Sequence, residues 1–141
     1  MSRDAAWAFF WQADRLAALL PGCRSVLEIE PQQRYVAEFE DRIGPYWLHF
    51  DMDIRVRETE PPRRIHLQAS GRDQRLGVTQ DLDLAVTLAA AGPNETVIAI
   101  VVEVDFRGKV ALLGHFVIRR KMRSVVEEFA ANVRRELARP A

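Results

Sequence analysis

Residues 46–60 of the chain read YWLHFDMDIRVRETE, and this stretch decides the fold class. From residue 48 onward apolar and polar side chains alternate, which is the pattern of a β-strand with two unlike faces. One face is predicted to be buried and the other solvated, as in an antiparallel sheet. The residues on the buried side are Leu48, Phe50, Met52, Ile54 and Val56, and those on the solvated side are His49, Asp51, Asp53, Arg55 and Arg57.

The period of two continues on both sides of this strand. Turns are predicted at Gly44-Pro45, at Pro61-Pro62 and at the GPNE stretch of residues 92–95. Residues 96–106, TVIAIVVEVDF, are apolar at nearly every position, so this strand is predicted to be covered on both faces. About five or six antiparallel strands are expected, and the inward residues of the stretch 77–91 are Leu82, Leu84, Val86 and Leu88.

Helical spacing is confined to the two ends of the chain. Trp7, Phe10 and Trp11 recur at helical intervals before Pro21-Gly22, which predicts one or two short helices. Residues 116–137 are predicted to form one long amphipathic helix, whose apolar stripe is Ile118, Met122, Val125, Val126, Phe129, Val133 and Leu137. The prediction is an α+β fold in which a curved sheet carries this helix on its concave face.

Composition limits the classes of function. A chain of 141 residues with 48% apolar and 28% charged residues is expected to form one globular domain, residues 1–141. Its 20 Lys and Arg balance its 20 Asp and Glu, which argues against nucleic acid as a partner. A single cysteine, no signal peptide and no 18-residue apolar span predict a cytoplasmic protein, with peripheral contact at the inner membrane face left open.

No group of residues specifies catalysis, a cofactor or a metal site. Cys23 lies between a Pro-Gly turn and a strand, where a buried structural thiol is favoured over a nucleophile. Asp51 with Asp53, and Asp81 with Asp83, share solvated faces, so cross-strand charge pairing is favoured over metal binding. Metal binding would need a third ligand, and His49 is the only nearby candidate.

Large apolar side chains are abundant, and two interpretations remain open. They fill a core, or they line an apolar pocket between the sheet and the long helix. The candidate ligand-binding residues are Trp7, Phe10, Trp11, Phe50, Met52, Ile54, Leu82, Leu84, Leu113, Phe116, Met122 and Val126.

Three stretches together resemble the family of the carbon monoxide dehydrogenase G subunit, which is a branch of the START-related helix-grip superfamily. They are LAALLPGCRSV, IGPYWLHFDMDIRVRETEPPRRIHLQASG and FRGKVALLG, in that order and ahead of a final helix. The resemblance implies a helix-grip sheet of six to seven strands around an apolar cavity. It also implies a non-enzymatic carrier of quinone or lipid that serves a redox enzyme such as carbon monoxide dehydrogenase.

The resemblance also raises expectations about the start of the chain. Family members begin with a strand before the WAFF-like helix, so this first edge strand is expected to be absent here, and an open edge favours a homodimer. Other branches of the superfamily leave two alternatives open. One is a polyketide cyclase-like enzyme, and the other is a protein-interaction module with a filled cavity.

The stretch FRGKVALLG, residues 106–114, is predicted to be a gate or a membrane contact. Basic residues surround it, and apolar residues lie between its glycines, which suits reversible docking to anionic lipid. The alternative is that Leu112 and Leu113 pack inward as a plug. The candidate gate residues are Arg107, Gly108, Lys109, Leu112, Leu113, Gly114, Arg119 and Arg120.

Overall fold

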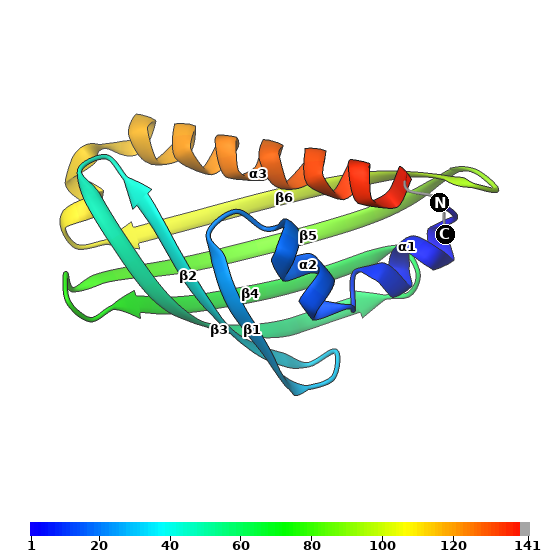
Figure 1. Ribbon diagram of the computed structural model, residues 1–141, viewed down its shortest axis with the longest axis horizontal. Helices are drawn as coiled ribbons and strands as arrows, with labels where there is room; N and C mark the ends of the chain where they lie inside the picture. The colour runs from blue at the N-terminus through cyan, green and yellow to red at the C-terminus, as the bar shows by residue number, and fades with distance from the viewer. Residues whose placement is uncertain (139–141) are drawn as a thin grey trace.

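The computed structural model describes residues 1–138, which form a sheet and three α-helices. The elements are α1 (Arg3–Phe9), α2 (Ala13–Leu19), β1 (Cys23–Glu30), β2 (Arg34–Ile43), β3 (Tyr46–Glu60), β4 (Arg64–Asp73), β5 (Val78–Gly92), β6 (Glu95–Arg107), the 3-10 helix η1 (Lys109–Leu113) and α3 (His115–Ala138). The α+β fold class is confirmed, and α3 runs lengthwise along the sheet (Figure 1).

The sheet is a simple meander of six antiparallel strands in the order β1-β2-β3-β4-β5-β6. Short turns connect successive strands, and Ile43 pairs with Tyr46 across the Gly44-Pro45 turn. The predicted alternation of β3 is confirmed because Leu48, Phe50 and Met52 are buried. Six strands fall within the predicted range, and a seventh is not present within residues 1–138.

All three helices pack on one face of the sheet. One core cluster lies under α1 and includes Phe9 and the residue that ends this helix, Phe10. These side chains pack with Val133 of α3 and with Ile65 and Val86 of the sheet. The other cluster lies at the opposite end and is built mainly from strand residues, with α3 contributing the half-buried Ile118 and Met122. The space between these two clusters is where a cavity can form.

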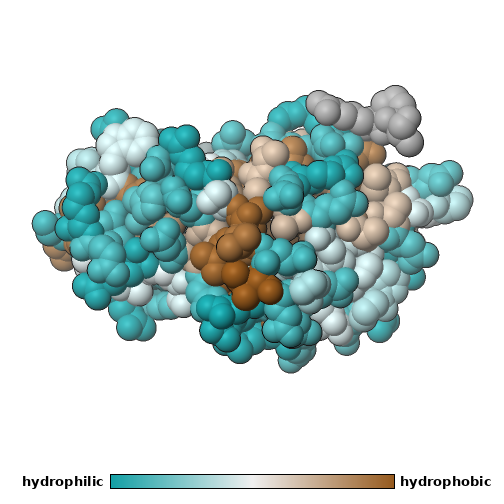
Figure 2. Space-filling model, turned by 60° about the horizontal axis from the view of Figure 1, so that its bottom comes forward, coloured by the Kyte–Doolittle hydropathy of each residue, from teal (hydrophilic) through white to brown (hydrophobic). Residues whose placement is uncertain are grey.

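The prediction that β6 is covered on both faces is wrong. Its residues alternate between half-buried and exposed, and Val101 is 62% exposed. The physical reason is that the helices cover only one face of a single-layer sheet, and β6 forms one of its edges. Other apolar side chains are also exposed, including Leu27 and Ile29 on β1. A view with the underside turned forward shows a compact apolar patch surrounded by hydrophilic residues (Figure 2).

Candidate functional site

An apolar cavity of about 290 Å³ lies between the inner face of the sheet and the helices. The strands form its floor, and α2, α3 and the C-terminal end of α1 form its roof. The lining residues from the floor include Tyr35, Ala37, Phe39, Ile43, Leu48, Phe50, Met52, Ile54, Leu67, Ala69, Gln80, Leu82, Leu84, Ile100, Val102 and Phe106.

The strand register keeps this floor closely packed on one side of the cavity. Met52 on β3 pairs with Gly71 on β4. A Cβ atom added to Gly71 would lie 2.5 Å from the Met52 sulfur, so the glycine makes room for the methionine side chain. A larger residue at position 71 would clash with the Met52 sulfur and with the Asp51 carbonyl oxygen, which is also 2.5 Å away.

Polar contacts attach α3 to its neighbours at two places. Near one end, Lys121 Nζ lies 2.9 Å from Asp41 Oδ1 of β2. Near the other end, Asn132 Nδ2 donates to the Leu19 carbonyl oxygen over 2.8 Å, and Arg15 of α2 pairs with Glu136. The α3 residues between these attachments that line the cavity are Met122, Val125, Val126 and Phe129.

Few polar groups reach the cavity wall. Asp41 and Gln80 bring a carboxylate and an amide, and the Asp41 carboxylate is engaged by Lys121. The Tyr35 hydroxyl accepts a hydrogen bond from the Gln32 amide, and burial raises the pKa of this phenol. Burial also raises the pKa of the Cys23 thiol, which disfavours the thiolate needed for nucleophilic attack. The wall is therefore suited to an uncharged, mainly apolar ligand.

One further polar atom lies beside the cavity without a hydrogen bond. The Trp11 indole nitrogen is buried and has no partner within residues 1–138. Its ring packs edge-on against Trp7, with the two ring centroids 5.7 Å apart.

Two comparisons with known proteins place this sheet and long helix among known folds and families. The model of the CoxG family, the G subunit of carbon monoxide dehydrogenase, matches residues 1–138. The chain belongs to this family. A crystal structure of a conserved protein from Geobacillus kaustophilus has the same fold, with a TM-score of 0.85 and 19% sequence identity over 97% of this chain and 88% of that chain. No curated protein matches the chain.

Most of the predicted ligand-binding residues of this CoxG-family chain line the cavity. Those that do are Phe10, Trp11, Phe50, Met52, Ile54, Leu82, Leu84, Met122 and Val126. Three others lie elsewhere. Trp7 packs against the α1 core cluster, Leu113 is half-buried beside Gly44, and Phe116 is 75% exposed at the start of α3.

Residues from α2 and β2 at the cavity wall were missed by the sequence interpretation. Leu16, Ala17 and Leu20 come from α2 and its C-terminal end, and Tyr35 and Phe39 come from β2. The β2 residues carried a usable signal, because apolar residues at positions 35, 37 and 39 alternate with Arg34, Val36, Glu38 and Glu40, three of which are charged. The α2 residues also carried a signal, because Ala13, Leu16, Ala17 and Leu20 recur at helical spacing while Asp14 and Arg15 are exposed.

The predicted gate forms the connection between β6 and α3. Gly108 and Gly114 both have positive φ, at 99° and 91°, and a Cβ atom at Gly108 would lie 2.8 Å from the Gly77 carbonyl oxygen. Between them Val110 is fully buried and Leu112 is 85% exposed. The plug alternative is therefore wrong for Leu112, which points away from the core.

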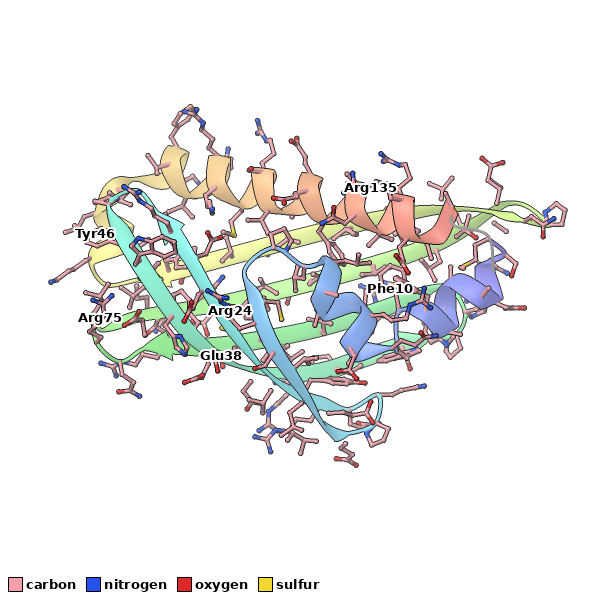
Figure 3. All side chains as sticks on the ribbon, viewed as in Figure 1. Phe10, Arg24, Glu38, Tyr46, Arg75 and Arg135 are labelled. Atoms are coloured by element: carbon pink, nitrogen blue, oxygen red, sulfur yellow. The ribbon has the colours of Figure 1, made fainter. Side chains whose placement is uncertain are left out.

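Further exposed groups lie at the same end of the molecule. Trp47, just after the β2–β3 turn, is 61% exposed, and Arg75 Nη2 donates to its carbonyl oxygen over 2.9 Å. Tyr46 and Arg75 mark this end in Figure 3. The candidate basic residues Arg107, Lys109, Arg119 and Arg120 are all exposed. No helix within residues 1–138 is long and apolar enough to span a bilayer.

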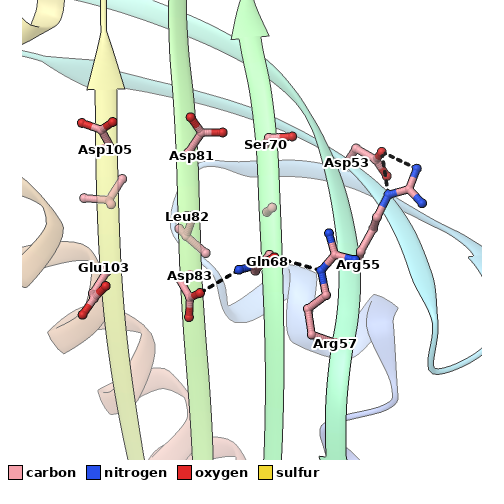
Figure 4. Close-up of a pocket in the computed structure, with 12 residues that line it drawn as sticks. Asp53, Arg55, Arg57, Gln68, Ser70, Asp81, Leu82, Asp83, Glu103 and Asp105 are labelled. Carbon is pink, nitrogen blue, oxygen red and sulfur yellow. Dashed lines mark hydrogen bonds and ion pairs between the residues drawn. The ribbon is translucent and has the colours of Figure 1, made fainter.

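The outer face of the sheet holds a shallow polar groove of about 530 Å³. Figure 4 shows Asp53 joined to Arg55, and Gln68 joined to both Arg57 and Asp83. Hydrogen bonds from Arg34 and Arg55 lower the pKa of Asp53, so its carboxylate is stabilised in the charged form. The cross-strand charge pairing predicted for Asp53 is present as its ion pair with Arg34 of β2 over 3.0 Å, whereas the Asp53–Arg55 contact lies within β3, and Asp83 is contacted across the sheet by Gln68 and His66 of β4.

Proposed function

We propose that this CoxG-family protein is a non-enzymatic carrier that holds a quinone or a lipid in its internal cavity. The observation that supports the proposal is the cavity itself, whose wall is almost wholly apolar and whose carboxylate is already paired. A volume of about 290 Å³ is at the lower end of small-molecule sites, so a ring with a short tail fits better than a whole phospholipid.

The chemistry of the wall favours a carrier over an enzyme. General acid–base catalysis needs a titratable group within reach of the substrate. None of the three histidines lines the cavity, the Asp41 carboxylate is paired with Lys121, and burial raises the pKa values of the Tyr35 phenol and the Cys23 thiol, which disfavours their charged forms. The ligand would therefore leave the cavity chemically unchanged.

We further propose that the end carrying η1 docks reversibly on the inner face of the membrane. Leu112, Phe116 and Trp47 would insert into the interface, and nearby Lys and Arg would contact anionic headgroups. Each cation near such a surface contributes about 1 kcal/mol. The partner suggested by the family name is carbon monoxide dehydrogenase, so the carrier would serve a redox enzyme of that class.

Ligand binding is tested with two matched substitutions. Val126→Trp fills the cavity from α3, whereas Val101→Trp places the same side chain on the exposed face of β6. After incubation with vesicles containing a short-tailed quinone, the solvent extract of wild type and of Val101→Trp should hold stoichiometric quinone. The extract of folded Val126→Trp should hold none. Equal quinone in both variants, or none in wild type, would refute the carrier proposal.

Membrane docking has its own pair of variants. Leu112→Asp with Phe116→Asp removes two exposed apolar groups of the η1 end, and Val97→Asp with Val101→Asp makes two matching changes on the exposed face of β6. In a flotation assay with anionic vesicles, the first variant should no longer float with the vesicles, whereas the second should float as wild type does. Retention of both variants would exclude docking through η1 while leaving the carrier proposal intact.

A further inference from the structure

A histidine surrounded by carboxylates lies on the outer face of β2 and β3, away from the cavity. Strand register places Glu40 opposite His49 and Glu38 opposite Asp51. The ring of His49 lies within 4.0 Å of all three carboxylates. The potential ligand atoms of Glu38, Glu40 and His49 all lie within 4.8 Å of one another.

The contact of His49 Nδ1 with Glu40 sets the direction of the other ring nitrogen, Nε2. Nδ1 lies 3.2 Å from Glu40 Oε1, and the other oxygen of Glu40 accepts from Arg24 Nε and Nη2 at 3.1 and 2.8 Å. With its proton on Nδ1, the ring donates to Glu40 and presents the Nε2 lone pair. Histidines that bind metals are oriented by a carboxylate in this way.

Nε2 faces the two remaining carboxylates. It lies 3.5 Å from Asp51 Oδ1 and 3.9 Å from Glu38 Oε1. Ligands about 2.0–2.2 Å from a tetrahedral zinc ion are themselves about 3.3–3.6 Å apart. The separation of Nε2 from Asp51 Oδ1 is within this range, and its separation from Glu38 Oε1 is slightly above it.

The charge at this place also favours a cation. Glu38 and Asp51 are directly opposite each other on one face, and like charges in that relation destabilise a sheet. Within residues 1–138 neither carboxylate has a Lys or Arg nitrogen within 4.0 Å. By contrast Asp53, the next residue on the same face of β3, is paired with Arg34 and Arg55.

The backbone under the cluster is held in place from the neighbouring turn. The amide nitrogen of His49 donates to Asp73 Oδ2 over 2.8 Å, and Asp73 is only 2% exposed. The four side chains of the cluster are all partly exposed, so an ion can reach them from solvent. The backbone at His49 is therefore fixed by a hydrogen bond, and the potential ligand atoms are accessible to solvent.

We propose that His49 Nε2, Glu38 and Asp51 bind a divalent zinc-type cation, with water in the remaining position and Glu40 as the residue that positions the imidazole. The competitor for Nε2 is a proton, because the hydrogen bond to Glu40 and the charges of Glu38 and Asp51 raise the pKa of His49. The bound ion would link β2 to β3 and neutralise the facing carboxylates. It would not contact a cavity ligand.

The test is calorimetric titration of tag-free protein with zinc chloride in a non-chelating buffer. Wild type should bind one zinc ion, and His49→Gln, Glu38→Gln and Asp51→Asn should each weaken binding at least about tenfold. His66→Gln is the matched control, because His66 lies on the same outer face but contacts a single carboxylate, Asp83. This control should bind zinc as wild type does.

A second pair of variants examines the positioning role of Glu40. Glu40→Gln keeps an oxygen that accepts from Nδ1, whereas Glu40→Ala removes it, so the alanine variant should bind zinc more weakly than the glutamine variant. Zinc should also raise the Tm of wild type and of His66→Gln but not of His49→Gln. No saturable binding by wild type below about 1 mM zinc, or equal losses in His49→Gln and His66→Gln, would overturn the proposal.

Discussion

Asp73 supports the most specific prediction about stability. It ends β4, it is 2% exposed, and its two oxygens accept backbone hydrogen bonds from two places. Oδ2 accepts from the His49 amide over 2.8 Å, and Oδ1 accepts from the Leu76 amide over 2.9 Å. Although burial acts in the opposite direction, these bonds lower the pKa of Asp73 below its ordinary value.

The size of the effect follows from the groups that would lose their partner. Asp73→Ala leaves two amide donors without an acceptor, and each costs about 1–3 kcal/mol. The free energy of unfolding should therefore fall by roughly 2–6 kcal/mol. Asp73→Asn keeps one acceptor oxygen and turns an NH₂ group toward the other amide, so it should cost about half as much.

Urea denaturation followed by circular dichroism measures both variants against wild type. Val97→Ala, a change at an exposed residue of β6, serves as the control and should lie within about 0.5 kcal/mol of wild type. A cost below about 1 kcal/mol for Asp73→Ala would refute the reasoning, because it would mean that water satisfies the two donors.

Three further predictions concern single side chains. Trp11→Phe should lower the free energy of unfolding by roughly 1–2 kcal/mol in the same assay, because the smaller ring loses packing against the α1 core cluster, whereas the lost indole nitrogen has no hydrogen-bond partner within residues 1–138. Val110→Ala removes two fully buried methyl groups from η1 and should cost about 2 kcal/mol; a change near zero would show that η1 is not anchored there. Hydrogen bonds from Gln68 and His66 lower the pKa of Asp83, so its stabilising effect exists above the unfolded pKa and is lost as the pH falls through the lower folded value. Urea titrations at pH 7 and pH 3 should accordingly show Asp83→Asn to be less destabilising at pH 3 than at pH 7.

Local periodicity was sufficient to predict the buried residues of elements that have one face exposed to solvent. The alternation in β3 predicted the burial of Leu48, Phe50 and Met52, and the stripe on α3 predicted that Val126 and Phe129 would face the sheet. Each of these patterns records directly which side of an element meets solvent. No knowledge of the other elements was needed.

Periodicity could not show which faces of a strand are covered by the helices. The apolar run in β6 is compatible with cover on both faces, and only the placement of every helix on one face leaves Val101 exposed. Phe116 illustrates an error that helical geometry could have prevented. It precedes Ile118 by two residues, which is about 200° around the helix, so it lies opposite the apolar stripe.

The carboxylate cluster around His49 was, by contrast, within reach of the sequence. A two-residue turn at Gly44-Pro45 pairs Ile43 with Tyr46, and each step back along β2 then meets one step forward along β3. This register alone brings Glu40 opposite His49 and Glu38 opposite Asp51. The alternation within β3 alone does not indicate the cluster, because Glu38 and Glu40 belong to β2. The hairpin register therefore predicts the proposed metal ligands, whereas the cavity depends on how three helices cover the sheet and becomes visible only in the folded chain.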